Sequence, residues 1–274
     1  MVPVESIPTE SPPPPAWLVA QRWERLLFAH WQVDPHALRS VLPPGVEPDV
    51  REGSAWLAIV AFVMVGTRAT GPPWWPVLAP IPELNVRTYV RVHGIPAVWF
   101  LSLDASSTFF ATIGRLLYGM RYHVSDMRAT EIDGRMLYES ARPGAAFEAT
   151  YSPAGPPANA EEGSLEHFLV ERYRLFSERR GRLITAVVAH EPWPLQPAHA
   201  RIAVNEMAPP GLEFRGEPIV HFCRSVSAVI SAPSVAGSVT GDERGRGVRR
   251  SARRVRTRRR FGPRGRAELP ADAG

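Results

Sequence analysis

Four polar side chains alternate along residues 83–90, a stretch whose composition is typical of a β-strand. Successive residues of a strand point to opposite faces. One face therefore carries Glu83, Asn85, Arg87 and Tyr89. A carboxylate, an amide, a guanidinium and a phenol in one row are suited to bind a small polar ligand. Such a strand either exposes this face to water or directs it into a small β-barrel, with its apolar face packed under a helix; the mixture of groups favours the barrel.

The two charged members of this row each have a chemical and a structural interpretation. Arg87 could hold a substrate carboxylate in a bidentate fork. Glu83 could act as a general base if burial raises its pKa. Alternatively, the two side chains form a structural ion pair, because they lie two strand steps apart on the same face. Asn85 and Tyr89 are expected to complete the substrate-binding row.

The elements that must position this row are mostly strands joined by hairpin turns. Residues 95–103 follow the His93-Gly94 turn and return as a partner strand. On that strand one face is expected to carry Val98, Phe100, Ser102 and Asp104. Further strands are predicted at residues 25–33, 54–67, 122–132, 135–141, 145–151, 183–189, 200–204 and 218–230. Many strands, hairpin turns and two substantial helices predict an α+β fold with an antiparallel, curled sheet.

The helices are expected between the strands. A short one covers residues 36–42 after the Asp34-Pro35 start signal, and another runs from an Asp104 or Ser106 cap to Tyr118. A third begins at Ser164, with an apolar stripe listed as Leu165, Phe168, Leu169, Tyr173 and Phe176.

The composition divides the 274 residues into three parts. Residues 1–17 form a proline-rich, disordered lead-in, and residues 18–235 form a single barrel domain. Residues 236–274 form a disordered tail, in which 12 arginines stand against four acids from Gly237 onward. The arginines of the tail could bind nucleic acid or an anionic membrane. The favoured explanation is that the tail derives from a shifted reading frame. A nucleic-acid partner is therefore expected only if the tail is genuine.

Several absences limit the function. All 32 basic residues are arginine, so no side chain can form a Schiff base. No histidine spacing indicates a metal centre, and no cofactor motif occurs. The sequence has no apolar run of about 20 residues and no export signal, which predicts a cytoplasmic protein without a membrane partner.

A loop with Trp74 and Trp75 either covers a cavity or plugs a barrel end, and it makes a homodimer plausible.

The chain resembles the bacterial YqjF-like family, which has no established reaction and is placed in the acetoacetate-decarboxylase-like superfamily. The matching segments span about residues 23–233 and are FAHWQVD, LPPGVEPD, GSAWLAIVAF, PELNVRTYV, VWFLSLDASS, FLVERYRLF and HEPWPLQPA. This resemblance implies a β-barrel or cone around a small-molecule cavity.

The resemblance also indicates where the chain departs from the decarboxylases. The segment GRLLYGMRYH, from Gly114, is similar to the one that carries the Schiff-base lysine in those enzymes. By that spacing, Tyr122 and His123 stand where lysines would be, so lysine-dependent decarboxylation is excluded. Tyr122 and His123 are adjacent in a strand, so only one of them can face inward as an acid or base. Arg115 either reaches the cavity or favours the C-terminus of its helix, and Asp104 is either a helix cap or a site residue.

These residues support a protein that binds a small polar or carboxylate-bearing molecule in a barrel cavity and acts on it by acid/base chemistry without lysine. The alternatives are a ligand-binding or sensor module without turnover, and nucleic-acid association through the tail.

Overall fold

The computed structural model describes residues 17–70 and 79–238. All of them belong to one compact unit, Met1–Gly241. The expected lead-in up to residue 16, the Trp74-Trp75 loop and the arginines of the tail lie outside the described residues. The sheet itself extends slightly past the expected domain, because its first strand begins at Trp17 and its last ends at Ser238.

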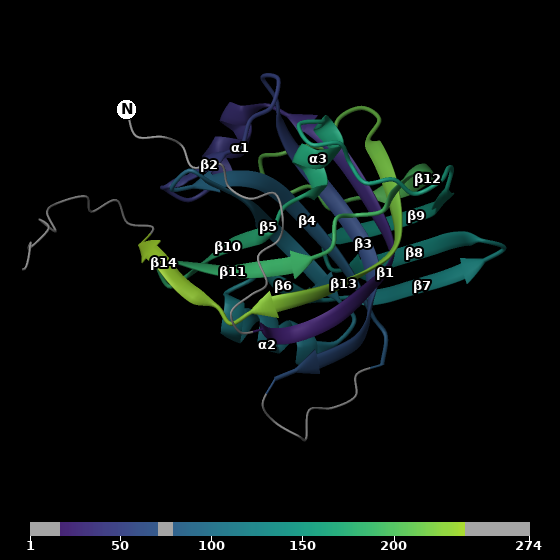
Figure 1. The fold of residues 1–274 in the computed structure, drawn as a ribbon, viewed down its shortest axis with the longest axis horizontal. Helices are drawn as coiled ribbons and strands as arrows, with labels where there is room; N and C mark the ends of the chain where they lie inside the picture. The colour runs from purple at the N-terminus through teal and green to yellow at the C-terminus, as the bar shows by residue number, and fades with distance from the viewer. Residues whose placement is uncertain (1–16, 71–78, 239–274) are drawn as a thin grey trace, which may run out of the picture. The chain divides into compact units, whose positions relative to one another are not determined.

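A ring of hydrogen-bonded strands forms the centre of the fold (Figure 1). Its members, in spatial order, are β11 (Arg182–His190), β10 (Arg174–Arg179), β5 (Ile95–Ala105), β4 (Ile81–Val92), β3 (Ala55–Ala69), β1 (Trp17–Val33) and β13 (Ile219–Ser231). Pairing between β11 and β13 closes the ring. Most neighbours are antiparallel, whereas β10 runs parallel to β5. The expected antiparallel barrel is thus present.

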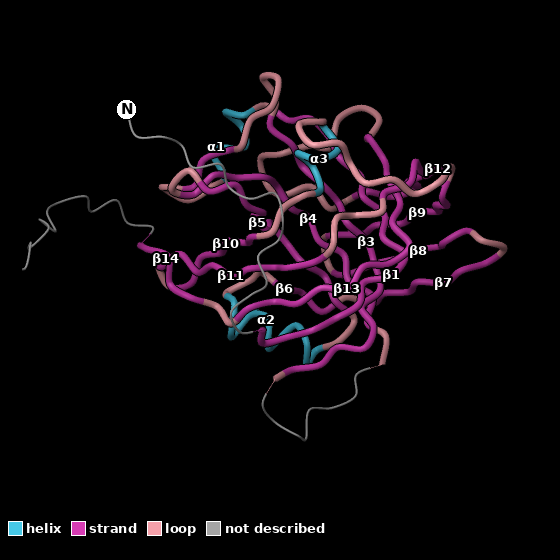
Figure 2. The backbone as a smooth tube through the Cα atoms, viewed as in Figure 1, coloured by secondary structure: helices cyan, strands magenta, loops and turns pink. Residues whose placement is uncertain are grey.

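The remaining strands branch from this ring. Short strands pair with β4, β5 and β11, namely β2 (Val46–Pro48), β6 (Tyr122–Val124) and β14 (Ser234–Ser238). A second layer continues from β13 and consists of β12 (Leu195–Asn205), β9 (Ala145–Pro153), β8 (Arg135–Arg142) and β7 (Asp126–Ile132). Figure 2 shows that strands make up most of the described chain.

The second layer packs on the outside of the barrel. Leu84 and Val86 of β4 share an apolar cluster with Tyr138 and Phe147 of β8 and β9. The Tyr138 hydroxyl donates to the backbone carbonyl of Glu83 at 2.7 Å. The apolar face of β4 is therefore covered mainly by strands. The same cluster also contains Leu38 of a helix, α1 (Pro35–Val41), so the expected helix provides only part of the cover. With that face sealed, the polar face of β4 must point into the barrel.

The helices are short and well capped. α1 (Pro35–Val41) begins after Asp34, whose side chain accepts from the His36 amide, as the sequence predicts. α2 (Thr108–Tyr118) begins after Ser107 instead of the expected Asp104 or Ser106, and ends at Gly119 in the left-handed conformation.

The third helix is much shorter than its apolar stripe suggested. α3 (Leu165–Val170) begins after Ser164 as predicted, but Tyr173 follows it and Phe176 lies in β10. β10 fills the place in the ring between β5 and β11. Pairing with distant strands therefore overrides a local helical spacing at these positions.

A β-bulge changes which side chains of β5 face inward. Arg87 lies opposite Phe100, whereas the residue before Arg87 lies opposite Ser102, so one residue of β5 has no partner. Phe100 and Leu103 consequently both line the barrel interior. Asp104 points to the second layer instead. The expectation that Phe100, Ser102 and Asp104 share one face was wrong for this reason.

Candidate functional site

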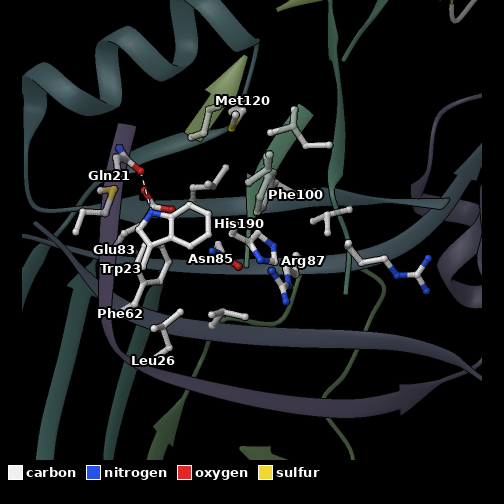
Figure 3. A pocket seen from close by; sticks show the side chains of 18 of the residues that line it. Gln21, Trp23, Leu26, Phe62, Glu83, Asn85, Arg87, Phe100, Met120 and His190 are labelled. Carbon is white, nitrogen blue, oxygen red and sulfur yellow. Dashed lines mark hydrogen bonds between the residues drawn. The ribbon is translucent and has the colours of Figure 1, made fainter. Parts of the chain in front are cut away.

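The barrel interior holds a cavity of about 90 Å³ (Figure 3). Its wall is largely apolar and aromatic, and includes Trp23, Phe28, Phe62, Phe100 and Met120. Polar side chains of the wall come from several strands and are Gln21, Glu83, Asn85, Arg87, Tyr122, Arg172, Arg174 and His190. A concave, largely apolar space with polar groups on its wall is typical of a small-molecule site.

Glu83 is a buried carboxyl group near the cavity end formed by Tyr122. The Tyr122 hydroxyl donates to Glu83 Oε2 at 2.8 Å. Burial raises the pKa of Glu83 from 4.5 to about 7, although the hydrogen bonds from Tyr122 and Asn85 act in the opposite direction. This carboxyl group can therefore both accept and release a proton near neutral pH. Burial and the neighbouring Glu83 hold the pKa of Tyr122 well above its usual value, so Tyr122 stays a donor.

Arg87 is buried in the cavity wall, with 9% of its surface exposed. Its Nε and Nη2 atoms have no hydrogen-bond partner. The guanidinium carbon lies 5.6 Å from the ring centre of Phe28 and 5.8 Å from that of Tyr89. Among the described residues no ion pair joins Arg87 to Glu83. The side chain thus presents unused donors on a charged group, which is costly in a buried position without a partner.

Asn85 lies between these two charged residues on the same face of β4. It is buried, and its Oδ1 atom has no hydrogen-bond partner. Asn85 therefore leaves an unpaired buried acceptor beside the unpaired donors of Arg87. In Figure 3 the labelled Asn85 and Arg87 side chains lie near each other, with His190 beside them.

His190 is a cavity residue that the sequence did not single out, because no second histidine or carboxylate stands at a recognisable spacing. Its Nδ1 donates to the Glu191 carbonyl at 2.8 Å, which leaves Nε2 as the acceptor of the neutral ring. The ring centre lies 4.6 Å from that of Trp193 and 4.8 Å from that of Tyr173. Burial lowers the pKa of His190, and nearby Arg87 acts in the same direction.

Gln21 was also missed, because the first strand begins at Trp17 and not at residue 25 as expected. The Trp23 indole N–H donates to Gln21 Oε1 at 2.8 Å. Gln21 is 5% exposed, and its Nε2 atom has no partner. The only sequence signal was the apolar composition of residues 17–20, which continues the strand upstream.

Three of the proposed site residues lie away from the cavity. Tyr89 faces the interior, but it is covered by Phe168 at 5.9 Å between ring centres, and its hydroxyl bonds to His30 Nε2 at 2.8 Å. His123 is exposed, since its neighbour Tyr122 takes the inward position. Arg115 is exposed on α2 and donates to Thr112.

Asp104 is a structural residue and not a helix cap. It is fully buried, and the Arg142 side chain donates to it at 2.9 Å from β8. Ser125 Oγ also donates to this carboxylate, at 2.7 Å. These contacts join β5 to the second layer.

Within residues 17–70 and 79–238, no group of three or more His, Cys, Asp or Glu side chains is placed to hold a metal ion. No helix in the same part of the chain is long and apolar enough to cross a membrane.

The chain is similar to known proteins in sequence and in fold. The sequence pattern of DUF2071, described as "Uncharacterized conserved protein (COG2071)", matches residues 20–227. The uncharacterised protein YqjF of Bacillus subtilis (strain 168) is 36% identical over 219 residues, which cover 78% of this chain and 90% of that protein. The YqjF resemblance inferred from the sequence is confirmed.

Solved structures share the fold at low sequence identity. An acetoacetate decarboxylase from Legionella pneumophila is 14% identical, with a TM-score of 0.57 over 87% of this chain and 93% of that chain. The enduracididine biosynthesis enzyme MppR, complexed with pyruvate, is 15% identical, with a TM-score of 0.57 over 82% of this chain and 90% of that chain. An acetoacetate decarboxylase-like enzyme from Sphingomonas wittichii RW1 is 12% identical, with a TM-score of 0.58 over 81% of this chain and 94% of that chain. The expected acetoacetate-decarboxylase-like fold is confirmed.

Proposed function

The chain belongs to the DUF2071 family, and we propose that it binds a small carboxylate-bearing molecule inside the barrel and acts on that molecule by acid/base chemistry. One observation carries this proposal. Arg87 is buried in the cavity wall and only 9% exposed, yet two of its guanidinium nitrogens have no partner. The two oxygens of a carboxylate match two adjacent guanidinium donors in a bidentate pair.

The cavity is suited to an acid of a few carbon atoms. On the scale where one water needs roughly 10–15 Å³, a cavity of about 90 Å³ accepts about six to nine non-hydrogen atoms. Pyruvate, with six, fits this size. MppR, which shares the fold, has been observed with bound pyruvate, and that supports a small oxo acid as a first probe.

Glu83 is the proposed acid/base group. With the ligand carboxylate on Arg87, the next atoms of the ligand lie toward Asn85 and then Glu83, because the three residues follow one another along one face of β4. A carboxyl group with a pKa of about 7 is suited to remove or return a proton next to a carbonyl group. The sequence contains no lysine, so this chemistry proceeds without a Schiff base.

Isothermal titration calorimetry with pyruvate tests the binding step. Arg87→Met should weaken pyruvate binding at least tenfold, because it removes the charged donors while keeping a long apolar side chain. Arg22→Met is the matched control, since the Arg22 side chain is 58% exposed and does not line the cavity. Equal affinity of the native protein and Arg87→Met, with both folded by circular dichroism, would contradict the proposal.

A second candidate function is a binding module of the same fold without turnover, which the unpaired groups of Arg87 and Asn85 favour equally. Exchange of solvent deuterium into the methyl group of bound pyruvate, followed by proton NMR, separates the two. Acid/base catalysis predicts exchange that Glu83→Gln abolishes while binding is retained. Binding without enzyme-dependent exchange would favour the module.

A further inference from the structure

We infer that the ligand of the barrel is an amphiphilic acid, with its carboxylate on Arg87 and an apolar chain in a second cavity behind Tyr122. We further infer that it carries a carbonyl or hydroxyl oxygen between these ends. This inference deepens the proposed function and rests on it. It concerns the substrate class, which the family and the fold leave open.

The second cavity has a volume of about 50 Å³ and lies between α2 and the barrel. Apart from Gln21, Thr67 and two tyrosines, its wall consists of apolar residues and glycine. Five side chains border both cavities, namely Gln21, Phe110, Met120, Tyr122 and Ile230. The two spaces are therefore neighbours separated by one layer of side chains.

The second cavity lies at the Glu83 end of the first one. Tyr122 forms part of both walls, and its hydroxyl donates to Glu83 at 2.8 Å. Arg87 lies four residues further along β4, which corresponds to about 14 Å between the two Cα atoms. Figure 3 shows the labelled Gln21 and Glu83 on one side of the cavity and Arg87 on the opposite side. A ligand whose carboxylate contacts Arg87 thus extends toward the apolar space.

Gln21 places a polar group at the junction of the two cavities. Its Oε1 is fixed by the Trp23 indole N–H at 2.8 Å, so the amide orientation is set and Nε2 is left as a donor. That donor is buried and has no partner in the protein. A carbonyl or hydroxyl oxygen of a ligand that passes this point would satisfy it.

The shared wall can adapt to a chain that passes through it. Met120 is unbranched, and it is only partly buried between the two spaces. At Gly114, the ring of Tyr122 occupies the place of a side chain, because a Cβ atom there would lie 2.3 Å from the ring. The absence of a side chain at Gly114 therefore keeps α2 close enough to enclose the second cavity.

Calorimetric titration of the full chain with straight-chain alkanoates from propanoate to nonanoate tests the apolar site. A volume of about 50 Å³ corresponds to about three to five water-sized groups. Once the chain reaches this space, affinity should rise about fourfold per methylene over about four carbons and then level off. Affinity that stays flat or falls with length, while short acids bind through Arg87, would overturn the inference and leave the proposed function intact. If no acid binds at any length, the proposed function fails first.

Variants on α2 locate the chain. Ile113→Phe fills the second cavity, because Ile113 lines it and does not line the first one. It should abolish the gain from propanoate to nonanoate and leave propanoate binding unchanged. Leu116→Phe is the matched control, since Leu116 is 56% exposed on the same helix and lines neither cavity. Loss of the gain in the control alone, or in neither variant, would overturn the location, and the series with the native chain stands even if Ile113→Phe does not fold.

The donor of Gln21 is tested by an oxo group in the ligand chain. The better binder of 4-oxononanoate and 5-oxononanoate should bind to the native protein about tenfold more tightly than nonanoate, because one buried hydrogen bond is gained. Gln21→Met should remove this advantage and retain nonanoate binding. If the oxo acids show no advantage over nonanoate, the oxygen-binding role of Gln21 is overturned.

Discussion

Replacement of Glu83 by glutamine should make the protein relatively more stable at neutral pH than at acidic pH. Glutamine has nearly the same shape as glutamate, and its carbonyl oxygen can still accept the hydrogen bond from the Tyr122 hydroxyl. The substitution therefore removes the titration of one buried group while it disturbs the packing little. The difference in the free energy of unfolding between the two proteins therefore measures the cost of ionising this buried carboxyl group.

The magnitude follows from the pKa of Glu83, which is raised from 4.5 to about 7. Between these values the folded protein keeps its proton and the unfolded chain releases it, so the stability of the native protein falls as pH rises. The shift corresponds to about 3 kcal/mol in the free energy of unfolding. Below pH 4.5 Glu83 is protonated in both the folded and the unfolded chain, so its burial carries no ionisation cost. Above pH 7 the penalty is complete and constant.

Urea denaturation of both proteins, at half-unit steps from pH 4 to pH 8.5, measures this difference. The free energy of unfolding of Glu83→Gln, minus that of the native protein, should rise by about 3 kcal/mol between pH 4.5 and pH 7 and then level off. The other titrating groups are present in both proteins and cancel. A difference that varies by less than 0.5 kcal/mol, or one that falls with pH, would refute a buried carboxyl group with a raised pKa.

Two further substitutions test the parts that position the site. Gly114→Ala should destabilise the protein by about 1–3 kcal/mol and weaken pyruvate binding, because the new methyl group would displace the Tyr122 ring. Urea denaturation measures the stability and calorimetry the binding. Gly155→Ala is the control and should change neither quantity, because its methyl group would meet other atoms only at 3.4 Å. Asp104→Asn should lower the free energy of unfolding by about 2 kcal/mol, because Arg142 loses a charged acceptor. It should leave pyruvate affinity unchanged. A loss of affinity as large as that of Arg87→Met would contradict a purely structural role of Asp104.

The sequence predicted the most local features of the site. Alternation along residues 83–90 predicted correctly that Glu83, Asn85 and Arg87 face the same cavity, because side-chain direction in a strand depends only on position. The same argument places Tyr89 on this face, but it could not show that α3 covers that end of the row. The adjacency argument for Tyr122 and His123 left two options, and packing against α2 decided between them.

Features that depend on distant contacts could not be predicted. The bulge that turns Asp104 outward arises in the pairing of β4 with β5 and leaves no mark in the composition of either strand. Arg87 and Glu83 were equally compatible with an ion pair until the structure showed them apart. His190 and Gln21 reach the cavity only because β11 and β1 belong to a closed ring, which a single sequence does not reveal.

A crystal structure of the full chain with bound pyruvate is the most direct test of the central claim. The account predicts a carboxylate within hydrogen-bond distance of the Nε and Nη2 atoms of Arg87, with the remainder of the ligand directed toward Asn85 and Glu83. Pyruvate bound outside the barrel, or an empty cavity at saturating pyruvate with Arg87 paired to Glu83, would contradict it.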